Sequence, residues 1–218
     1  MKKTLLLLSL IFCSIISSAQ IDSTTIYYKS LENKELKTIC DLANIQVEKI
    51  SCNDTLLRGK VFNFIIKEFK KGIVSSEKNL NITARKEQIP MVVDGKNIIY
   101  TIDYTSKTGF GNSNDSLTIT FAGLLNKKKF KLNIEYPGMG ISREIKGDEN
   151  YLLKIANSCS ENKIRVPVNV EYPILAYTPP FDTGTKIQSY CILGEENVLD
   201  WYKKFKVKHY YVIYLEIK

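Results

Sequence analysis

Few side chains in this chain are suited to nucleophilic or metal-dependent catalysis. His209 is the only histidine among the 218 residues, and imidazole is the commonest general base and metal ligand in proteins. No Gly-x-Ser-x-Gly elbow supplies a serine nucleophile. Cysteine and histidine do not cluster at the spacing of a zinc site, and neither a P-loop nor a Gly-x-Gly-x-x-Gly segment occurs. The sequence therefore predicts neither a metal nor a cofactor, and it predicts a structural role for His209.

One short motif has the residues of an acid catalyst. Phe181-Asp182-Thr183-Gly184-Thr185 resembles the active-site signature of aspartic proteases, in which a hydrophobic residue precedes Asp-Thr-Gly-Ser/Thr. The resemblance implies that Asp182 is one of two carboxylates that share a proton and activate water, with a second copy supplying its twin. The chain departs from the family at Pro179-Pro180, which interrupts the strand before the aspartate. Asp-Thr-Gly is also ordinary turn chemistry.

Aromatic residues near two turns are the candidate binding residues. Tyr177 and Phe181 flank a stiff segment with two prolines, and Trp201, the only tryptophan, is followed by Tyr202. Large, rigid, amphipathic rings bind sugars and protein partners well. The open alternative is that these rings fill the core beneath their loops.

The first 19 residues have the layout of a secretory signal peptide. Lys2 and Lys3 precede an apolar run from 4 to 16, and small residues at 17–19 follow it. The run is too short to cross a ~30 Å hydrocarbon core as a helix, although a retained anchor is the alternative. We expect a mature chain from Gln20, located in the periplasm or outside the cell, with no transmembrane segment.

Four cysteines remain after cleavage, namely Cys40, Cys52, Cys159 and Cys191. An even number in an oxidising compartment predicts two disulfides, and three pairings are possible. We favour Cys40–Cys52 and Cys159–Cys191, because each pair closes a local loop. A loop of this length is worth about 3 kcal/mol in the chain-entropy treatment.

The charge balance is basic but does not indicate a nucleic-acid partner. The formal net charge is +8 and falls to +6 when the two lysines of the signal segment are removed. Only four of the 31 basic residues are arginines, the residue favoured for bidentate contacts to bases and phosphates. A lysine-rich solvated surface is the main interpretation, and attraction to anionic glycans or membrane surfaces is the alternative.

Alternating apolar and polar residues predict a mostly β protein. About ten short strands are expected, and turn residues separate them. The ranges are 61–69, 91–93, 98–104, 116–121, 130–136, 151–156, 163–172, 186–193 and 207–217, with strand character also beginning at 45. Asp94-Gly95 is a strong hairpin dipeptide between two of them. The fold class is therefore an all-β sandwich or barrel.

Helices are expected in only two places. Good N-cap residues before Ile26 and Leu31 predict a short helix over 24–37, and apolar residues over 195–205 allow another. The expected organisation is a signal peptide at 1–19, an N-terminal segment with a helix and a disulfide at 20–57, and a β-sandwich at 58–218, with the last two packed as one unit.

These features predict an exported, disulfide-stabilised, β-rich binding or structural protein rather than an enzyme. Its partner, a protein or a glycan, and its oligomeric state are left open. The alternative is a secreted carboxylate-dependent hydrolase built around Asp182.

Overall fold

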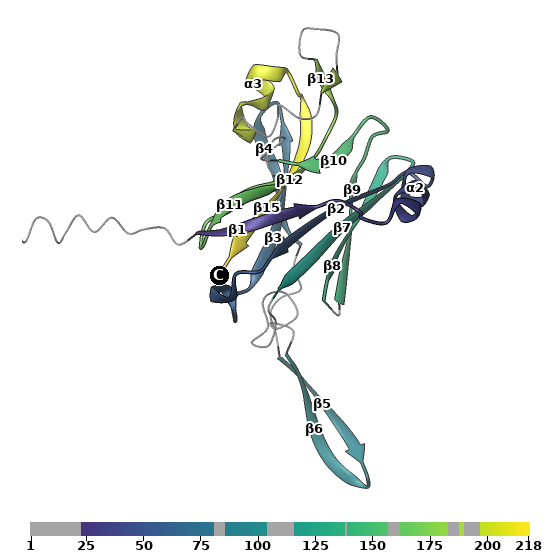
Figure 1. Ribbon diagram of the computed structural model, residues 1–218, viewed down its shortest axis with the longest axis vertical. Coiled ribbons are helices and arrows are strands. Elements are labelled where there is room, and N and C mark those ends of the chain that lie inside the picture. Colours follow the sequence, from purple (N-terminus) through teal and green to yellow (C-terminus); the bar gives the residue numbers. More distant parts are fainter. Residues whose placement is uncertain are drawn as a thin grey trace, which may run out of the picture.

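Two antiparallel sheets pack face to face and enclose the main hydrophobic core (Figure 1). The computed structural model describes residues 23–80, 86–103, 116–137, 139–156, 162–182, 188–189 and 197–218. Each sheet has two free edges, so the sheets do not close into a barrel. The predicted all-β class is confirmed, and of the two predicted architectures the packed pair of sheets is the one observed.

The larger sheet has six strands in the order β11-β1-β2-β7-β8-β9. Their bounds are Lys163–Pro167 (β11), Ser23–Lys29 (β1), Ile45–Cys52 (β2), Leu117–Asn126 (β7), Lys129–Tyr136 (β8) and Met139–Lys146 (β9). β8 shows why these segments form half-buried strands: Phe130, Leu132 and Ile134 are buried, whereas Lys129, Lys131 and Glu135, which alternate with them, are exposed. In a strand, successive side chains point to opposite faces of the sheet, so every second residue lies on the same face.

The smaller sheet has five strands in the order β10-β12-β15-β3-β4. Their bounds are Leu152–Ile155 (β10), Tyr172–Thr178 (β12), His209–Ile217 (β15), Phe62–Lys70 (β3) and Ile73–Asn79 (β4). Two further pairs are β13 (Phe181–Asp182) with β14 (Gln188–Ser189), and β5 (Lys86–Val93) with β6 (Lys96–Asp103).

β15 lies in the centre of the smaller sheet and is buried on both faces. Tyr211, Ile213 and Leu215 point into the core between the sheets. Tyr210 and Val212 point the other way, into a second cluster of buried side chains. This strand therefore reads as an almost continuous apolar run, as strands with two covered faces do.

Short helical segments complete the described part of the chain. They are α2 (Lys34–Leu42), η1 (Thr55–Leu57), η4 (Val198–Asp200) and α3 (Trp201–Phe205). Trp201 and Val198 belong to the second cluster, so η4 and α3 cover the outer face of β15. None of the described helices has the length and hydropathy required to cross a membrane.

The helix expected over 24–37 is wrong for its first half, which is strand β1. Thr24, Ile26 and Tyr28 are buried while their neighbours are not, so a period of two decides this segment. The helix begins later, at Lys34, where the Asn33 side chain accepts a hydrogen bond of 2.9 Å from the backbone N–H of Leu36. Asn33 is thus the N-cap residue.

The predicted Cys40–Cys52 disulfide is also wrong, because both residues are buried free thiols. Cys40 lies on α2, whereas Cys52 ends β2, seven residues along an extended strand that rises about 3.3 Å per residue. Disulfide geometry requires Cα atoms within about 7 Å of each other. The Cys52 thiol lies 3.6 Å from Oγ1 of Thr24, and burial raises its pKa. Cys159 and Cys191 lie outside the described residues.

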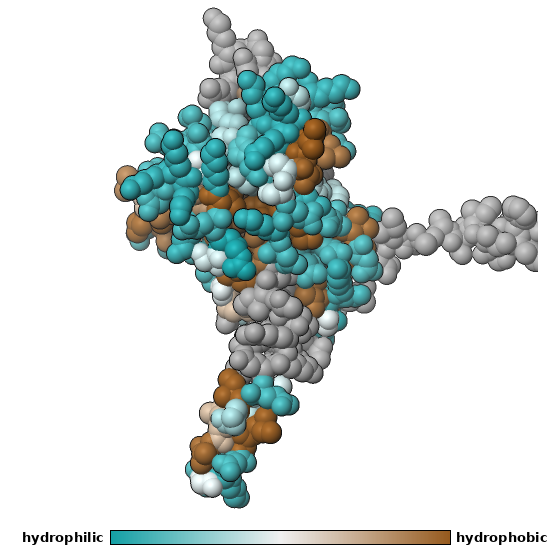
Figure 2. Space-filling model, turned by 180° about the vertical axis from the view of Figure 1, so that it is seen from behind, coloured by the Kyte–Doolittle hydropathy of each residue, from teal (hydrophilic) through white to brown (hydrophobic). Residues whose placement is uncertain are grey.

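The hairpin predicted at Asp94-Gly95 is confirmed. Asp94 and Gly95 have φ values of 52° and 73°, and Val93 pairs with Lys96 across them, as in a two-residue type I′ turn. The hairpin projects away from the two packed sheets (Figure 1). Hydrophobic side chains alternate with hydrophilic ones over its surface, whereas most of the visible surface of the sheets is hydrophilic (Figure 2). The exposed apolar side chains are those of Ile89, Met91, Val92, Val93, Ile98, Ile99 and Tyr100.

Gly123 provides a test of the core packing. A Cβ atom at this position would lie 1.9 Å from Cζ of Phe130, whose ring stacks on Tyr177 with centroids 4.0 Å apart. We expect Gly123→Ala to lower the free energy of unfolding by about 1–3 kcal/mol or more, the range for overpacked cores, in a denaturant titration.

Gly140→Ala is the matched control within the same sheet. Its added methyl group would meet only the carboxylate end of the exposed Glu135 side chain, which is free to rotate away. We expect a change within about 0.5 kcal/mol. Equal losses in the two variants would contradict the packing described for Phe130.

Candidate functional site

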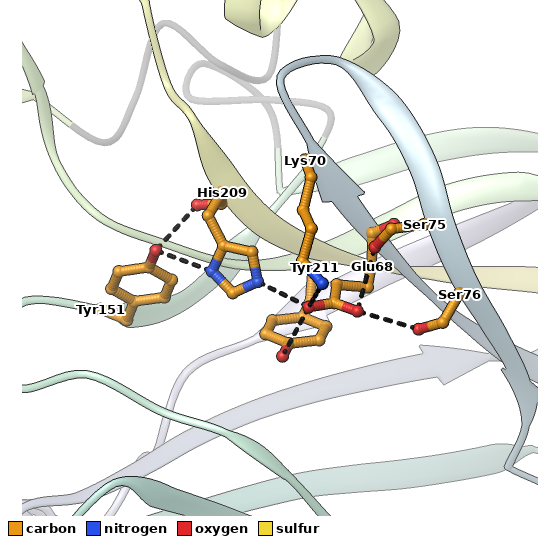
Figure 3. A network of polar contacts seen from close by, with 7 residues as sticks. All are labelled: Glu68, Lys70, Ser75, Ser76, Tyr151, His209 and Tyr211. Atoms are coloured by element: carbon orange, nitrogen blue, oxygen red, sulfur yellow. Dashed lines mark hydrogen bonds and ion pairs between the residues drawn. The ribbon is translucent and has the colours of Figure 1, made fainter.

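A network of polar side chains is centred on Glu68 of β3 (Figure 3). One carboxylate oxygen, Oε1, accepts from His209 Nε2 at 2.9 Å and pairs with Lys70 Nζ at 3.2 Å. The other, Oε2, accepts from the Ser75 and Ser76 hydroxyls at 3.0 and 3.1 Å. The carboxylate is therefore held by side chains from three neighbouring strands.

A β-bulge explains why two consecutive serines reach the same carboxylate. Glu68 is opposite Ser76, whereas the next residue, Phe69, is opposite Val74. Ser75 is thus the extra residue, and a bulge locally breaks the alternation of side chains. Both hydroxyls can then point to Glu68.

His209 is held on both of its ring nitrogens. Nδ1 lies 3.0 Å from the Tyr151 hydroxyl, which also lies 2.9 Å from the backbone carbonyl oxygen of His209. A phenol has one proton. Tyr151 donates that proton to the carbonyl oxygen, and its oxygen also contacts Nδ1, so both ring nitrogens of His209 have a polar partner.

Among these residues, the Glu68 carboxyl has its pKa shifted most strongly in favour of the charged form. Its partial burial alone would raise its pKa, but the hydrogen bonds from His209, Lys70, Ser75 and Ser76 outweigh burial and lower the pKa to about 2. The carboxylate is therefore ionised at neutral pH.

The two tyrosines of the network shift in the opposite direction. Burial, with a smaller effect of Asp148, raises the pKa of Tyr151 to about 12. Burial also raises the pKa of Tyr211, and the negative charge of Glu68 adds to the effect. Both phenols therefore stay protonated and act as hydrogen-bond donors rather than as nucleophiles.

A cavity of about 400 Å³ adjoins this network. It lies beside the edge strands β4 and β9, one from each sheet, and its volume is in the range of small-ligand sites. Tyr211 spans the space between the sheets, because its hydroxyl oxygen accepts a hydrogen bond from the backbone N–H of Lys146 on β9. The lining residues are Ile66, Glu68, Ser76, Lys78, Lys128, Lys129, Glu144, Ile145, Lys146 and Tyr211.

Four of these lining residues are lysines. Lys129 pairs with Glu144 at 3.1 Å, and Glu68 already has Lys70 and His209 as partners. Within the described part of the chain, no carboxylate forms an ion pair with the ammonium group of Lys78, Lys128 or Lys146. The cavity thus carries an excess of positive charge.

The aromatic residues predicted to bind a partner lie mostly in the interior. Trp201, Tyr177 and Phe181 are buried, and Tyr202 is half-buried. Trp201 packs against Tyr210 with centroids 5.0 Å apart. These positions agree with the alternative stated above, in which the rings fill the core beneath their loops.

Phe181 nevertheless lines a second cavity, of about 410 Å³, together with Pro179 and Pro180. Tyr151 and His209 line this second cavity as well, whereas Glu68 lines the first. The hydrogen-bonded chain from Tyr151 through His209 to Glu68 therefore connects the two cavities.

The hypothesis that Asp182 is a catalytic acid concerns a side chain that lies outside the described part of the structure, as residues 183–187 do. The backbone of Asp182 belongs to β13 and pairs with Gln188. In the part of the chain that is described, no group of three or more His, Cys, Asp or Glu side chains is placed to hold a metal ion.

The sequence reasoning missed Glu68, Ser75, Ser76 and the lysines of the first cavity. One signal was present: Glu68 is an acidic residue inside a strand that is otherwise dense in apolar residues. Such a residue requires a partner when its strand is buried. Its partner His209 lies 141 residues away in the chain, so this signal did not identify the partner.

The network predicts a pH-dependent stability difference. Glu68→Gln keeps the shape but loses the charge, and we expect a loss of about 1.5–3 kcal/mol in the free energy of unfolding at pH 7, as for a hydrogen bond to a charged group. The native pKa lies below the ordinary value of 4.5. The contribution of the charge is therefore fully present above about pH 4.5 and is lost as the pH falls towards 2.

Denaturant titrations between pH 7 and pH 2 measure this difference. Glu135→Gln, at an exposed position on β8, is the control and should match the parent protein throughout. A difference between Glu68→Gln and the parent that stays constant down to pH 2 would show that the charge of Glu68 has no stabilising role.

No protein-family model matches this chain, and neither a curated protein nor a solved structure matches it. The functional argument therefore depends on the geometry and charge of the site itself.

Proposed function

We propose that this chain is an exported binding protein and that the cavity beside β4 and β9 binds an anionic ligand. The observation that carries the proposal is the set of four lysines around one cavity whose two carboxylates already have basic partners. A concave site lined by one sign of charge concentrates ions of the opposite sign.

The expected affinity follows from the kind of contact. A solvent-accessible ion pair contributes about 0.2–1 kcal/mol. Four lysines together then supply at most about 4 kcal/mol to a simple anion, which corresponds to a dissociation constant near 1 mM. A larger ligand that also contacts the cavity walls would bind more tightly.

The signal layout of residues 1–19 supports the export part of the proposal, together with a location in the periplasm or outside the cell. Disulfide stabilisation is not part of the proposal for the N-terminal half, where Cys40 and Cys52 are free. The stability of the fold is instead attributed to the core between the sheets.

Processing tests the export proposal directly. We expect the intact mass of the secreted protein to correspond to a chain that begins at or near Gln20, because the small residues before it are those that a signal peptidase reads. A secreted protein that retains residues 1–19 would contradict this proposal.

Charge removal tests the anion site. The double variant Lys78→Gln/Lys146→Gln removes one ammonium group from each sheet, and we expect it to weaken the binding of inorganic sulfate about tenfold. Chemical-shift titration with sodium sulfate at constant ionic strength, with sodium chloride as the reference salt, measures the affinity.

Lys203→Gln is the matched control, because Lys203 is an exposed lysine of α3 that does not line the cavity. It should bind sulfate as the parent protein does. If the double variant also binds sulfate as the parent does, the cavity is not the anion site.

A further inference from the structure

We propose that the anionic ligand is an acidic saccharide, that is, sugar units bearing carboxylate or sulfate groups. This inference rests on the proposed anion site and adds the chemical class of the ligand. It comes from the wall of the cavity rather than from the lysines.

The wall offers hydrogen-bond acceptors beside the lysines. Ser76 donates its one hydroxyl proton to Glu68 at 3.1 Å, so its oxygen is left as an acceptor towards the cavity that it lines. One carboxylate oxygen of Glu144 pairs with Lys129, and the other is a further acceptor. A ligand that satisfies these oxygens needs hydrogen-bond donors as well as negative charge.

Neutral hydroxyls suit this wall better than ammonium groups. Nζ of Lys70 and Nε2 of His209 lie 3.2 and 2.9 Å from Oε1 of Glu68. Lys78, Lys128 and Lys146 line the cavity that Glu68 also lines. An added ammonium group would be repelled by these lysines, whereas a hydroxyl would not. An acidic sugar carries hydroxyls and acidic groups together and therefore matches this wall.

The remaining wall is apolar. Ile66, Ile145 and Tyr211 line the cavity with the polar residues, each with only a small exposed fraction. The exposed edges of the two isoleucines can contact the C–H face of a sugar ring. Among the described lining residues there is no arginine, and the one aromatic ring, that of Tyr211, is buried, so it offers no face on which a base could stack. These two features favour a saccharide over a nucleic acid.

The experiment compares ligands of equal charge on the full mature chain. Calorimetric titrations would use a galacturonic acid trimer, a sulfated disaccharide, a glutamate peptide matched to each in charge, a neutral maltotriose and a short uridine oligonucleotide. We expect at least one acidic saccharide to bind about tenfold more tightly than its matched peptide, and the neutral sugar not to bind. The carboxylated and sulfated arms identify which acid is preferred.

Two serine variants isolate the acceptor. Ser76→Ala should weaken saccharide binding about threefold to tenfold, the effect of one neutral hydrogen bond, without changing sulfate binding. Ser75→Ala is the matched control: Ser75 also donates to Glu68, at 3.0 Å, but does not line the cavity. It should leave saccharide affinity unchanged.

Several results would overturn the inference. Equal affinity for the saccharides and their matched peptides, or tighter binding of the oligonucleotide, would remove the saccharide class and leave the anion site standing. Equal effects of the two serine variants would show that Ser76 acts only through Glu68. Binding of none of these ligands, together with no sulfate binding, would remove the anion site as well.

Discussion

The fold depends on the burial of β15 on both of its faces. The side chains of such a strand point to both faces of the sheet and are apolar on both. Each face must therefore be covered by another layer of the structure. The six-stranded sheet supplies one layer, and η4 and α3 supply the other. The polar end of β15, at His209, lies where this double coverage stops, since His209 is only partly buried. The Glu68 network is built at that boundary.

Half-burying a carboxylate costs free energy unless cations and hydrogen-bond donors compensate for it. Glu68 has both, from His209, Lys70 and the two serines of the bulge. The consequence reaches beyond stability. Because the negative charge of Glu68 is balanced locally, it does not neutralise the lysines across the cavity, and because it orders Ser76, it fixes an acceptor in the cavity wall.

Local patterns in the sequence predicted strands within β3, β6, β7, β8 and β15 and the Asp94-Gly95 hairpin, since alternation and turn chemistry act between near neighbours. They did not predict β4, β9 or most of β12; β4 is exposed along its whole length and shows no alternation. They failed at β1, where N-cap residues suit a helix start but the two-residue period of Thr24, Ile26 and Tyr28 decides. An even number of cysteines does not say which of them lie close together in the fold. The predicted pairing of Cys40 with Cys52 was therefore wrong. The contact between His209 and Glu68 joins residues 141 positions apart. It depends on strand register, which no local pattern encodes.

The pairing of β3 with β15 also sets the order in which the smaller sheet can form. Residues 62–70 have their main neighbour in residues 209–217. Until that partner is available, β3 and β12 both expose unpaired backbone edges and rows of Phe, Ile and Leu side chains, which is the state in which strands pair with the wrong chain. Contacts this distant in sequence also form slowly. A newly made chain of this kind therefore depends on being kept apart from other copies until β15 has paired with β3.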